Sequence, residues 1–307
     1  MKIESHESQT VPSRGTQELF TKFRTEPTLK LSSFRGRAVQ RKRPMTLNGV
    51  WGVSVFHSYT SIRNTHSICH NLRMCGRYRL SRRKQVIDEH FDSISGEEDW
   101  SPRYNVAPTQ PVPVIRQPPK EPVRELWLMK WGLIPSWAKD PSGAASMINA
   151  RSETAATKPA FRDALKSRKC LIPADGFYEW AKTGKGKQPY CFEVNGGELF
   201  AFAGIWDRWK DTSGNWVRTC SILTTAPNAV TSTVHDRMPV ILDPDSYDVW
   251  LDPGMKNVDA ASELLKPYNA RLMRCYPVST RINSVTNNDA ECSARVELAQ
   301  VQNRLFW

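Results

Sequence analysis

Long apolar runs are missing from this sequence of 307 residues. The longest early stretch, around residues 50–56, falls far below the roughly 20 residues that a membrane-spanning helix needs. The first ten residues also lack the apolar core of a secretory signal. The seven cysteines are odd in number and include no CxxC pair, which argues against a disulfide framework and a zinc ribbon. We therefore expect a protein of the reducing cytoplasm without membrane contact.

Histidine is scarce from Met74 onward, where only His90 and His235 occur. A His-rich metal site is therefore not expected, and neither a P-loop, a GxGxxG nor a GxSxG motif is present. These absences predict a protein without metal or cofactor. The hydrophobic share of 39% and the charged share of 24% exclude collagen-like, coiled-coil and wholly disordered chains.

Positive charge is in excess, with a formal balance of +12, but it is unevenly placed. Residues 1–73 carry 12 Lys and Arg against four acids, whereas residues 74–307 carry 31 against 27. The first segment is rich in Ser, Thr and Arg and shows no sustained periodicity, which predicts a solvated, disordered extension. Most of the net positive charge therefore lies in residues 1–73, and it does not indicate that residues 74–307 bind nucleic acid.

From Met74 the pattern changes to short β-type runs separated by turn signals. This pattern predicts an α+β fold with one mostly antiparallel β domain at 74–290 and a C-terminal tail at 291–307. Strands are expected at 75–80, 112–116, 126–133, 169–174, 177–181, 189–194, 199–209, 218–226 and 238–243, and helices at 82–91, 158–168, 246–251 and 258–265.

Cys75 differs from the other cysteines because it directly follows a methionine. If translation begins at Met74, removal of that residue leaves Cys75 with a free α-amine beside its thiol. An α-amine has a pKa near ~7.7–8, against about 10.4 for lysine, so part of it is neutral at physiological pH. Such an amine forms an imine with an aldehyde, and the thiol then closes a thiazolidine ring. Cysteines 170, 191, 220 and 275 lie in or beside apolar strand patterns, and most of them are expected to be buried.

Six sequence blocks occur in an order that resembles the SRAP family (SOS response-associated peptidase, or abasic-site processing proteins). They are MCGRY at 74–78, RYNVAPT at 103–109, WGLIPSW at 131–137, INARSET at 148–154, ADGFYEW at 174–180 and HDRMP at 235–239. The resemblance covers about 75–285, and it implies a barrel-like sheet core with flanking helices.

The resemblance implies covalent trapping of abasic sites in single-stranded DNA. By motif position, Cys75 would be the nucleophile and Asn149 would position the opened sugar. Glu179 would be the general acid and base, and His235 would assist opening of the sugar ring. The implied partner is single-stranded DNA with an abasic site, bound by a monomer in the cytoplasm at the nucleoid, or in the nucleus of a eukaryote.

Five further residues are expected to contact DNA. Arg77 and Arg151 suit phosphate or sugar oxygens because a guanidinium can bind them with two hydrogen bonds. Trp137 and Pro108 are candidates for stacking on bases beside the lesion, and Asn105 belongs to the same block as Pro108. For the tryptophans of predicted strands, Trp127, Trp180 and Trp206, core packing is the expected role.

In the continuous chain the nitrogen of Cys75 is an amide, which is no nucleophile. Three explanations remain open: Met74 is the true initiator, residues 1–73 are removed by processing or self-cleavage, or the extension stays and the crosslinking activity is lost. Two other functions also remain open: a cysteine-type peptidase that acts on its own leader or on other proteins, and a non-covalent reader of modified DNA.

Overall fold

The computed structural model describes residues 76–184 and 186–298. Contacts divide the chain into two units, residues 1–62 and 63–307, and every described residue belongs to the second. The predictions for residues 1–73, for Cys75 and for the chain beyond 298 lie outside the described residues.

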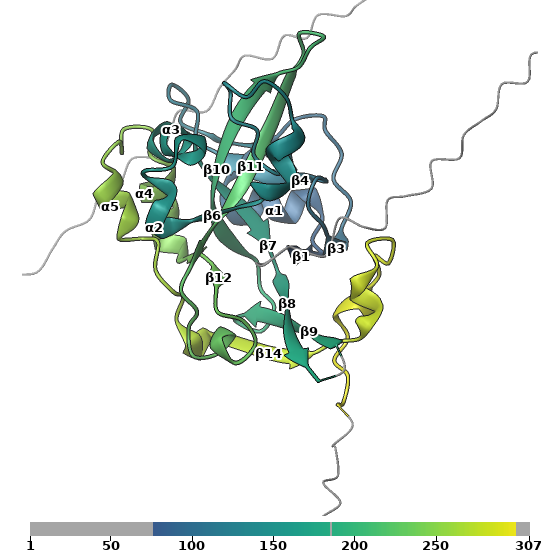
Figure 1. Ribbon diagram of the computed structural model, residues 1–307. Coiled ribbons are helices and arrows are strands. Elements are labelled where there is room, and N and C mark those ends of the chain that lie inside the picture. Colours follow the sequence, from purple (N-terminus) through teal and green to yellow (C-terminus); the bar gives the residue numbers. More distant parts are fainter. Residues whose placement is uncertain (1–75, 185, 299–307) are drawn as a thin grey trace, which may run out of the picture. The chain divides into compact units, whose positions relative to one another are not determined.

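Five strands close into a barrel at the centre of this unit (Figure 1). Each strand pairs antiparallel with the next, and the ring is closed where the fifth strand runs parallel to the first at Cys220 and Trp131. The predicted barrel-like α+β core is therefore confirmed. In order around the ring the strands are β11 (Trp216–Thr225), β10 (Phe200–Lys210), β7 (Lys169–Ala174), β4 (Pro111–Arg116) and β5 (Arg124–Trp131).

Short strands extend this barrel sheet. The predicted strand at 238–243 is wrong as one element because its first half pairs with β11 and its second half with β10. Val240 lies at the change of partner and bonds to both neighbours, donating to Leu223 O and accepting from Ala203 N. The short strands are β2 (Ser93–Ser95), β6 (Asn149–Arg151), β12 (Met238–Pro239) and β13 (Ile241–Leu242).

A second, antiparallel sheet packs against the barrel through aromatic side chains. Tyr78 is fully buried, and its ring makes edge contacts with Trp131 at 5.3 Å and Phe202 at 5.8 Å. Phe177 of the same sheet contacts Phe202 at 6.1 Å. In spatial order the strands are β14 (Met273–Pro277), β9 (Gly186–Val194), β8 (Gly176–Thr183), β1 (Arg77–Leu80) and β3 (Arg103–Val106).

The interior of the barrel is tightly filled. Gly204 of β10 has no room for a side chain, because a Cβ there would lie 2.9 Å from both Cys170 Sγ and Ile172 Cδ1. Such a contact is far below ordinary van der Waals distance. The barrel is thus a packed core, and ligands must meet the protein at its ends or outer faces.

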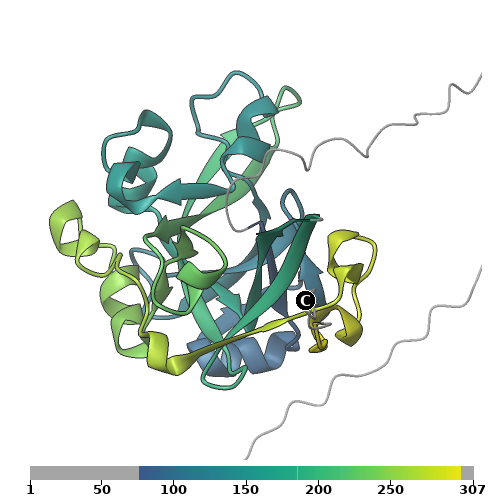
Figure 2. The same cartoon turned by 60° about the horizontal axis from the view of Figure 1, so that its bottom comes forward.

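Helices cover the outside, with α2 to α5 on one side of the domain and the segment near residues 280–293 on the other (Figures 1 and 2). Their buried residues recur at helical spacing, as with Ile87 and Phe91 in α1, which is capped by Asp92 in the left-handed region. In the described residues no helix is both long and apolar enough to cross a membrane. The helices are α1 (Lys84–Phe91), α2 (Ser152–Ala155), α3 (Pro159–Ser167), α4 (Tyr247–Leu251) and α5 (Val258–Ser262).

The described part of the C-terminal segment also packs on the domain. Cys292 is fully buried with Tyr178 and Ile282, and Arg295 forms a β-bridge with Val278. These contacts tie residues 290–296 to the second sheet.

A buried ionic network holds β1 to its neighbours. Arg79 Nε donates to Asp175 Oδ1 at 2.7 Å, and Arg79 also donates to Glu193 Oε1 at 2.9 Å. Asp175 is fully buried and also accepts from Ser81 N at 2.8 Å and Ser81 Oγ at 2.6 Å. Glu193 accepts as well from the Tyr276 hydroxyl at 2.8 Å and Arg274 Nε at 2.8 Å. Every charge in the network therefore has an opposite partner, as buried charges require.

The stability of the domain is expected to fall in acid through Glu193. Burial alone would raise the pKa of Glu193, but bonds from Tyr276, Arg274 and Arg79 outweigh it and lower the pKa. A lowered pKa in the folded state adds stability above the unfolded value near ~4.3, and this stability is lost as pH falls through the folded value. Urea unfolding of wild type and Glu193→Gln should therefore show a gap in free energy at neutral pH that narrows below about pH 4. A gap independent of pH would contradict this assignment.

Candidate functional site

Asn149 lies on β6, whose backbone is fixed on two sides. β6 runs parallel to β11, with Asn149 opposite Ile222 and Arg151 opposite Thr224. The preceding carbonyl, of Ile148, accepts from Ile222 N at 3.0 Å and from the indole of Trp131 at 2.9 Å. Asn149 is buried with its Oδ1 screened from solvent, whereas Arg151 is exposed. This strand therefore presents one buried amide and one exposed guanidinium.

Glu179 lies on β8 and is only 3% exposed. Its two chain neighbours anchor the strand: the Tyr178 hydroxyl donates to Tyr104 O at 2.8 Å, and Trp180 Nε1 donates to Asn283 Oδ1 at 2.8 Å. A carboxyl group so far removed from water is held by a rigid strand, as a proton-transferring group should be.

His235 lies in the loop between a short 3-10 turn, Thr231–Thr233, and β12. Its Nδ1 accepts from Arg237 N at 3.1 Å, and the carboxylate of Asp236 lies 3.1 Å from the same nitrogen. Both contacts are made at Nδ1, so they fix the orientation of the ring and leave Nε2 as the nitrogen outside them.

Arg237 joins the His235 loop to the segment after β6. Its guanidinium forms two bonds to Glu153, at 2.6 and 2.9 Å, and donates to Thr224 O at 2.7 Å. Its hydrogen bond is the main cause that lowers the pKa of Glu153. At Thr224, β11 has Arg151 on one side and Pro239 on the other, so this ion pair ties the two motif segments together across β11. Sequence reasoning missed Arg237, although its place in the HDRMP block was a signal.

Arg77 and Asn105 are both buried, and they bond to each other and to the protein interior. Arg77 Nη1 donates to Asn105 Oδ1 and to Ile282 O, each at 2.8 Å. Asn105 Nδ2 donates to Ser284 O at 2.9 Å and Asn287 O at 2.8 Å. The pair thus fixes the 282–287 loop to β1 and β3, and the contact of both residues with DNA stays a prediction.

Trp137 stands out from the surface, with 63% of the residue exposed. The loop that carries it is fixed to the β10–β11 hairpin, since Ile134 N donates to Thr219 Oγ1 at 2.9 Å and Ser136 N to Asp207 Oδ2 at 3.0 Å. Trp209 Nε1 also donates to Ala138 O at 2.7 Å. A fixed loop with an exposed indole suits stacking on a base. Pro108, the other predicted stacking residue, is half-buried.

Comparison with known proteins bears on these segments. The family model described as SOS response associated peptidase (SRAP) matches residues 74–285. The chain belongs to the SRAP family.

Relatives and solved structures agree with this assignment. The abasic site processing protein YoqW of Bacillus subtilis (strain 168) is 43% identical over 221 residues, which cover 71% of this chain and 98% of that protein. The abasic site processing protein HMCES of Gallus gallus is 35% identical over 232 residues, which cover 66% of this chain and 68% of that protein. A crystal structure of a protein from Bacteroides thetaiotaomicron matches with a TM-score of 0.67 and 28% identity, covering 73% of this chain and all of that one.

The remaining cysteines of the SRAP domain are poor nucleophiles. Cys170, Cys191 and Cys220 are fully buried and Cys275 is half-buried, which confirms the prediction that most of these four are buried. Burial raises the pKa of the Cys191 thiol to about 12 and that of Cys170 well above its usual value. These thiols stay protonated at neutral pH, so their roles are in packing.

The strand tryptophans of the SRAP domain pack partly as expected. Trp127 and Trp206 lie against the main core, and Trp180 lies against the smaller cluster around Tyr178. All three keep part of their surface exposed. His90 lies on the exposed side of α1, and partial desolvation by its surroundings lowers its pKa. Within residues 76–184 and 186–298, no group of three His, Cys, Asp or Glu side chains is placed to hold a metal ion.

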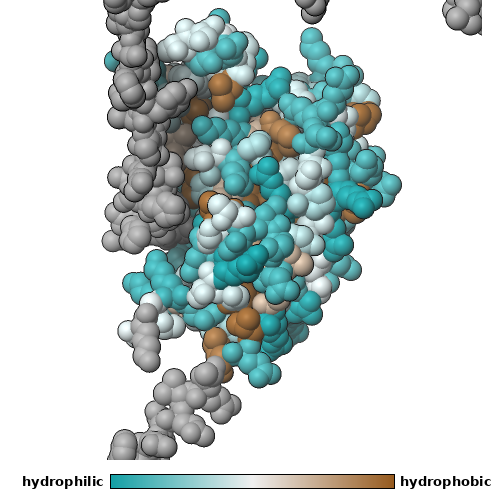
Figure 3. All heavy atoms as spheres, turned by 90° about the vertical axis from the view of Figure 1, so that its right-hand side faces the viewer, coloured by the Kyte–Doolittle hydropathy of each residue, from teal (hydrophilic) through white to brown (hydrophobic). Residues whose placement is uncertain are grey.

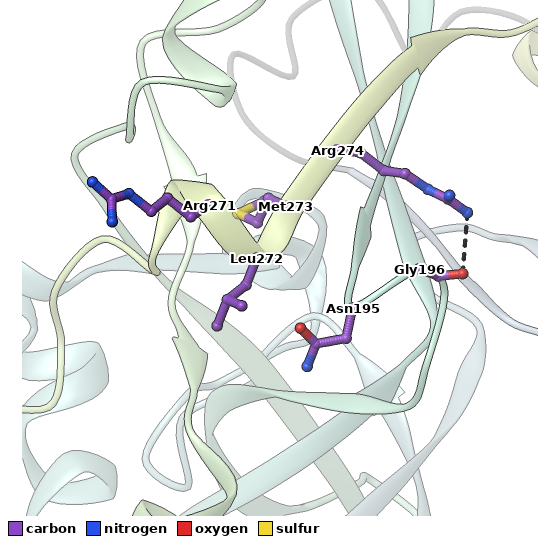
Figure 4. Close-up of a pocket in the computed structure, with 6 residues that line it drawn as sticks. All are labelled: Asn195, Gly196, Arg271, Leu272, Met273 and Arg274. Atoms are coloured by element: carbon purple, nitrogen blue, oxygen red, sulfur yellow. Dashed lines mark hydrogen bonds between the residues drawn. The ribbon is translucent and has the colours of Figure 1, made fainter.

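One pocket of the SRAP domain, of about 230 Å³, has none of the motif residues in its lining (Figure 4). Its two arginines point in different directions, and Arg274 is already bonded to Gly196 O and to Glu193. The pocket is therefore not a preformed anion site. It is lined by Asn195, Gly196, Arg271, Leu272, Met273 and Arg274.

Proposed function

We propose that this protein repairs abasic sites in DNA, and that Cys75, once N-terminal, captures the ring-opened sugar covalently. The relatives named abasic site processing proteins support the first part. The strand register supports the second. Arg77 pairs with Tyr178, next to the buried Glu179. Two peptide bonds separate residue 75 from Arg77, so its α-carbon stays within about 7.6 Å of the Arg77 α-carbon.

In the proposed reaction the α-amine of Cys75 attacks the aldehyde carbon, and the resulting carbinolamine loses one water to give an imine. The thiol then adds to the imine carbon, and its proton passes to the nitrogen. The product is a five-membered thiazolidine, and one water is released overall. Glu179 would donate the proton that the departing hydroxyl takes, and would accept it again on reversal.

Asn149 and His235 would act on the sugar. The amide of Asn149 would hold the opened sugar beside the amine by hydrogen bonds. His235 would assist ring opening by transferring a proton to the ring oxygen as the sugar opens. Single-stranded DNA is the proposed form because exposed Trp137 suits an unpaired base.

The peptidase description of the family favours a second candidate function. In it, the thiol of Cys75 cleaves the amide that precedes it, with Glu179 and His235 assisting. Such a cleavage would also create the amine that crosslinking needs, so the two functions can be successive.

The test incubates protein that begins at Cys75 with single-stranded DNA carrying one abasic site. An SDS-resistant adduct that is absent with intact DNA of the same sequence is the expected result. Mass spectrometry of the full chain, before and after incubation, checks for cleavage between Met74 and Cys75. No adduct combined with such cleavage would replace the proposal by the peptidase function.

Glu179→Gln is expected to slow adduct formation by about 100-fold, the lower end of the usual contribution of a general acid or base. Gln keeps the size of the side chain but carries no titratable proton. Binding of abasic DNA, measured by fluorescence anisotropy before the adduct forms, should change little. An equal loss of binding and rate would contradict a role in proton transfer.

A further inference from the structure

Arginine and tryptophan side chains gather at the barrel end opposite β1. Tyr78 of β1 contacts Trp131 and Phe202 at one end. Trp127 and Trp206 lie four residues away from these two along β5 and β10, or about 13 Å at ~3.3 Å per residue. Strand residues two and four positions apart point to the same face of a sheet. Trp127 and Trp206 therefore share the inner face of the barrel with Trp131 and Phe202, and they lie at its far end.

Two guanidinium groups stack on Trp127. The central carbon of Arg116 lies 3.8 Å from the centre of the indole and that of Arg218 lies 4.0 Å from it. Two guanidinium groups this close to the centre of one ring would collide if they lay over the same face. Arg116 and Arg218 therefore lie over opposite faces of the Trp127 indole. Trp206 makes an edge contact with Trp127 at 6.0 Å. The end of the barrel is therefore closed by alternating cations and indoles.

The same pattern continues along the β10–β11 hairpin. Arg218 stands directly opposite Arg208, and Trp216 stands opposite Lys210. Arg208 and Lys210 lie over the Trp216 ring at 4.9 and 5.8 Å. Trp216 is 56% exposed. We call these six residues the cationic ladder: Arg116, Trp127, Arg208, Lys210, Trp216 and Arg218.

The charge of the cationic ladder is not balanced within the described residues. Glu125 neutralises Arg116 at 2.6 Å. Asp211 follows Lys210, but its carboxylate accepts from Ser213 N and Asn215 N and is held in the hairpin turn. Two arginines opposite each other on neighbouring strands repel one another and destabilise the hairpin. An anionic partner would offset this repulsion.

The cationic ladder is separate from the abasic-site centre. The loop that presents Trp137 covers the other face of the same hairpin, through Asp207 and Trp209. Figure 1 shows the β10–β11 hairpin extending away from β8, β9 and β14. The face of the domain seen in Figure 3 is mainly hydrophilic, with apolar residues in small scattered groups. A strand of DNA that passes Trp137 would reach the cationic ladder by crossing the edge of the hairpin.

We propose that the cationic ladder is a second binding surface for single-stranded nucleic acid. Its unbalanced cations, Arg208, Lys210 and Arg218, bind backbone phosphates, and the exposed ring of Trp216 stacks on a base. Cations interleaved with an accessible indole are the combination that binds single strands without sequence preference. The inference takes from the proposed function only the identity of the polymer, DNA. Through this second surface the protein binds undamaged single-stranded DNA beside the lesion.

The test compares two lengths of single-stranded DNA, each with one central abasic site or none. An oligonucleotide of about 6 nucleotides fills only one site, whereas one of about 30 nucleotides exceeds the ~16 that a single binding module covers. The variants are Trp216→Ala and the triple change Arg208→Glu, Lys210→Glu and Arg218→Glu. The matched control reverses three exposed cations elsewhere, Lys166, Lys256 and Arg271, with the same change in net charge.

Both variants are expected to weaken binding of the long undamaged strand, Trp216→Ala by about fivefold or more. The triple variant should reduce the slope of log affinity against log salt by about 2, as loss of three phosphate contacts predicts. The control triple should keep the wild-type slope. Adduct formation with the short abasic strand should stay unchanged in all of them.

Unchanged binding of the long strand by both variants would overturn the inference, as would equal effects on both lengths. Binding of polyglutamate is measured with the same variants. If they lose polyglutamate binding but bind DNA as the wild type does, the partner of the cationic ladder is instead an acidic protein. Failure of the proposed function looks different: no adduct forms with either length, while long-strand binding still depends on the cationic ladder.

Discussion

Replacing Cys75 by Ala in protein that begins at residue 75 is expected to abolish the SDS-resistant adduct with abasic single-stranded DNA. Alanine keeps the α-amine, so an imine still forms, but no thiol is present to close the thiazolidine. The imine hydrolyses on denaturation, whereas the same sample treated with borohydride should retain a reduced adduct. This pair of results separates the role of the thiol from that of the amine.

The matched control for this variant is Cys275→Ala, which removes a half-buried thiol. Burial raises the pKa of Cys275, so its loss should leave adduct formation unchanged. The full chain, in which the nitrogen of Cys75 is an amide, should form neither adduct until it is cleaved before Cys75. An adduct of unchanged yield in Cys75→Ala without borohydride would exclude the thiazolidine.

Asp175→Asn is expected to destabilise the domain by about 3–5 kcal/mol, as loss of one partner of a buried ion pair does. Asp175 is fully buried, and its carboxylate accepts from Arg79 Nε, Ser81 N and Ser81 Oγ. Asparagine has the same shape but no charge, and its NH₂ group faces donors instead of an acceptor. The Arg79 guanidinium would then keep Glu193 as its remaining ionic partner.

Urea unfolding followed by fluorescence measures this loss. Asp289→Ala is the matched control, because Asp289 pairs with Arg281 at the surface and its loss should barely move the midpoint. The network holds β1, the strand that begins two residues after Cys75, so adduct formation should also slow in Asp175→Asn at temperatures where the domain is folded. A midpoint equal to that of the control would show that the network does not stabilise the fold.

Local patterns were enough to locate most of the elements. A short apolar run of β type predicted β7 at its observed bounds, and helical patterns predicted α1 and α3 within two residues. Three-residue strands such as β6 escaped prediction, because so few residues carry no periodicity. The split of the 238–243 strand escaped for another reason: a change of pairing partner leaves no mark in the local sequence.

The family was also accessible from the sequence, because six blocks in a fixed order are specific even where each block alone is weak. Those blocks named Cys75, Asn149, Glu179 and His235 as candidates. The net charge was a poor indicator of nucleic-acid binding by the SRAP domain, since two-thirds of the positive excess lies in residues 1–73.

The tertiary structure alone decided which polar side chains bond to one another. Arg77 and Asn105 are 28 positions apart, and Glu153 and Arg237 are 84 apart, yet each pair is in direct contact. It also decided that β5 and β11 close the barrel and that cations and indoles from four strands stack at one end. Periodicity and turn residues report on the nearest few neighbours in the chain, whereas such contacts depend on which distant strands the whole core brings together.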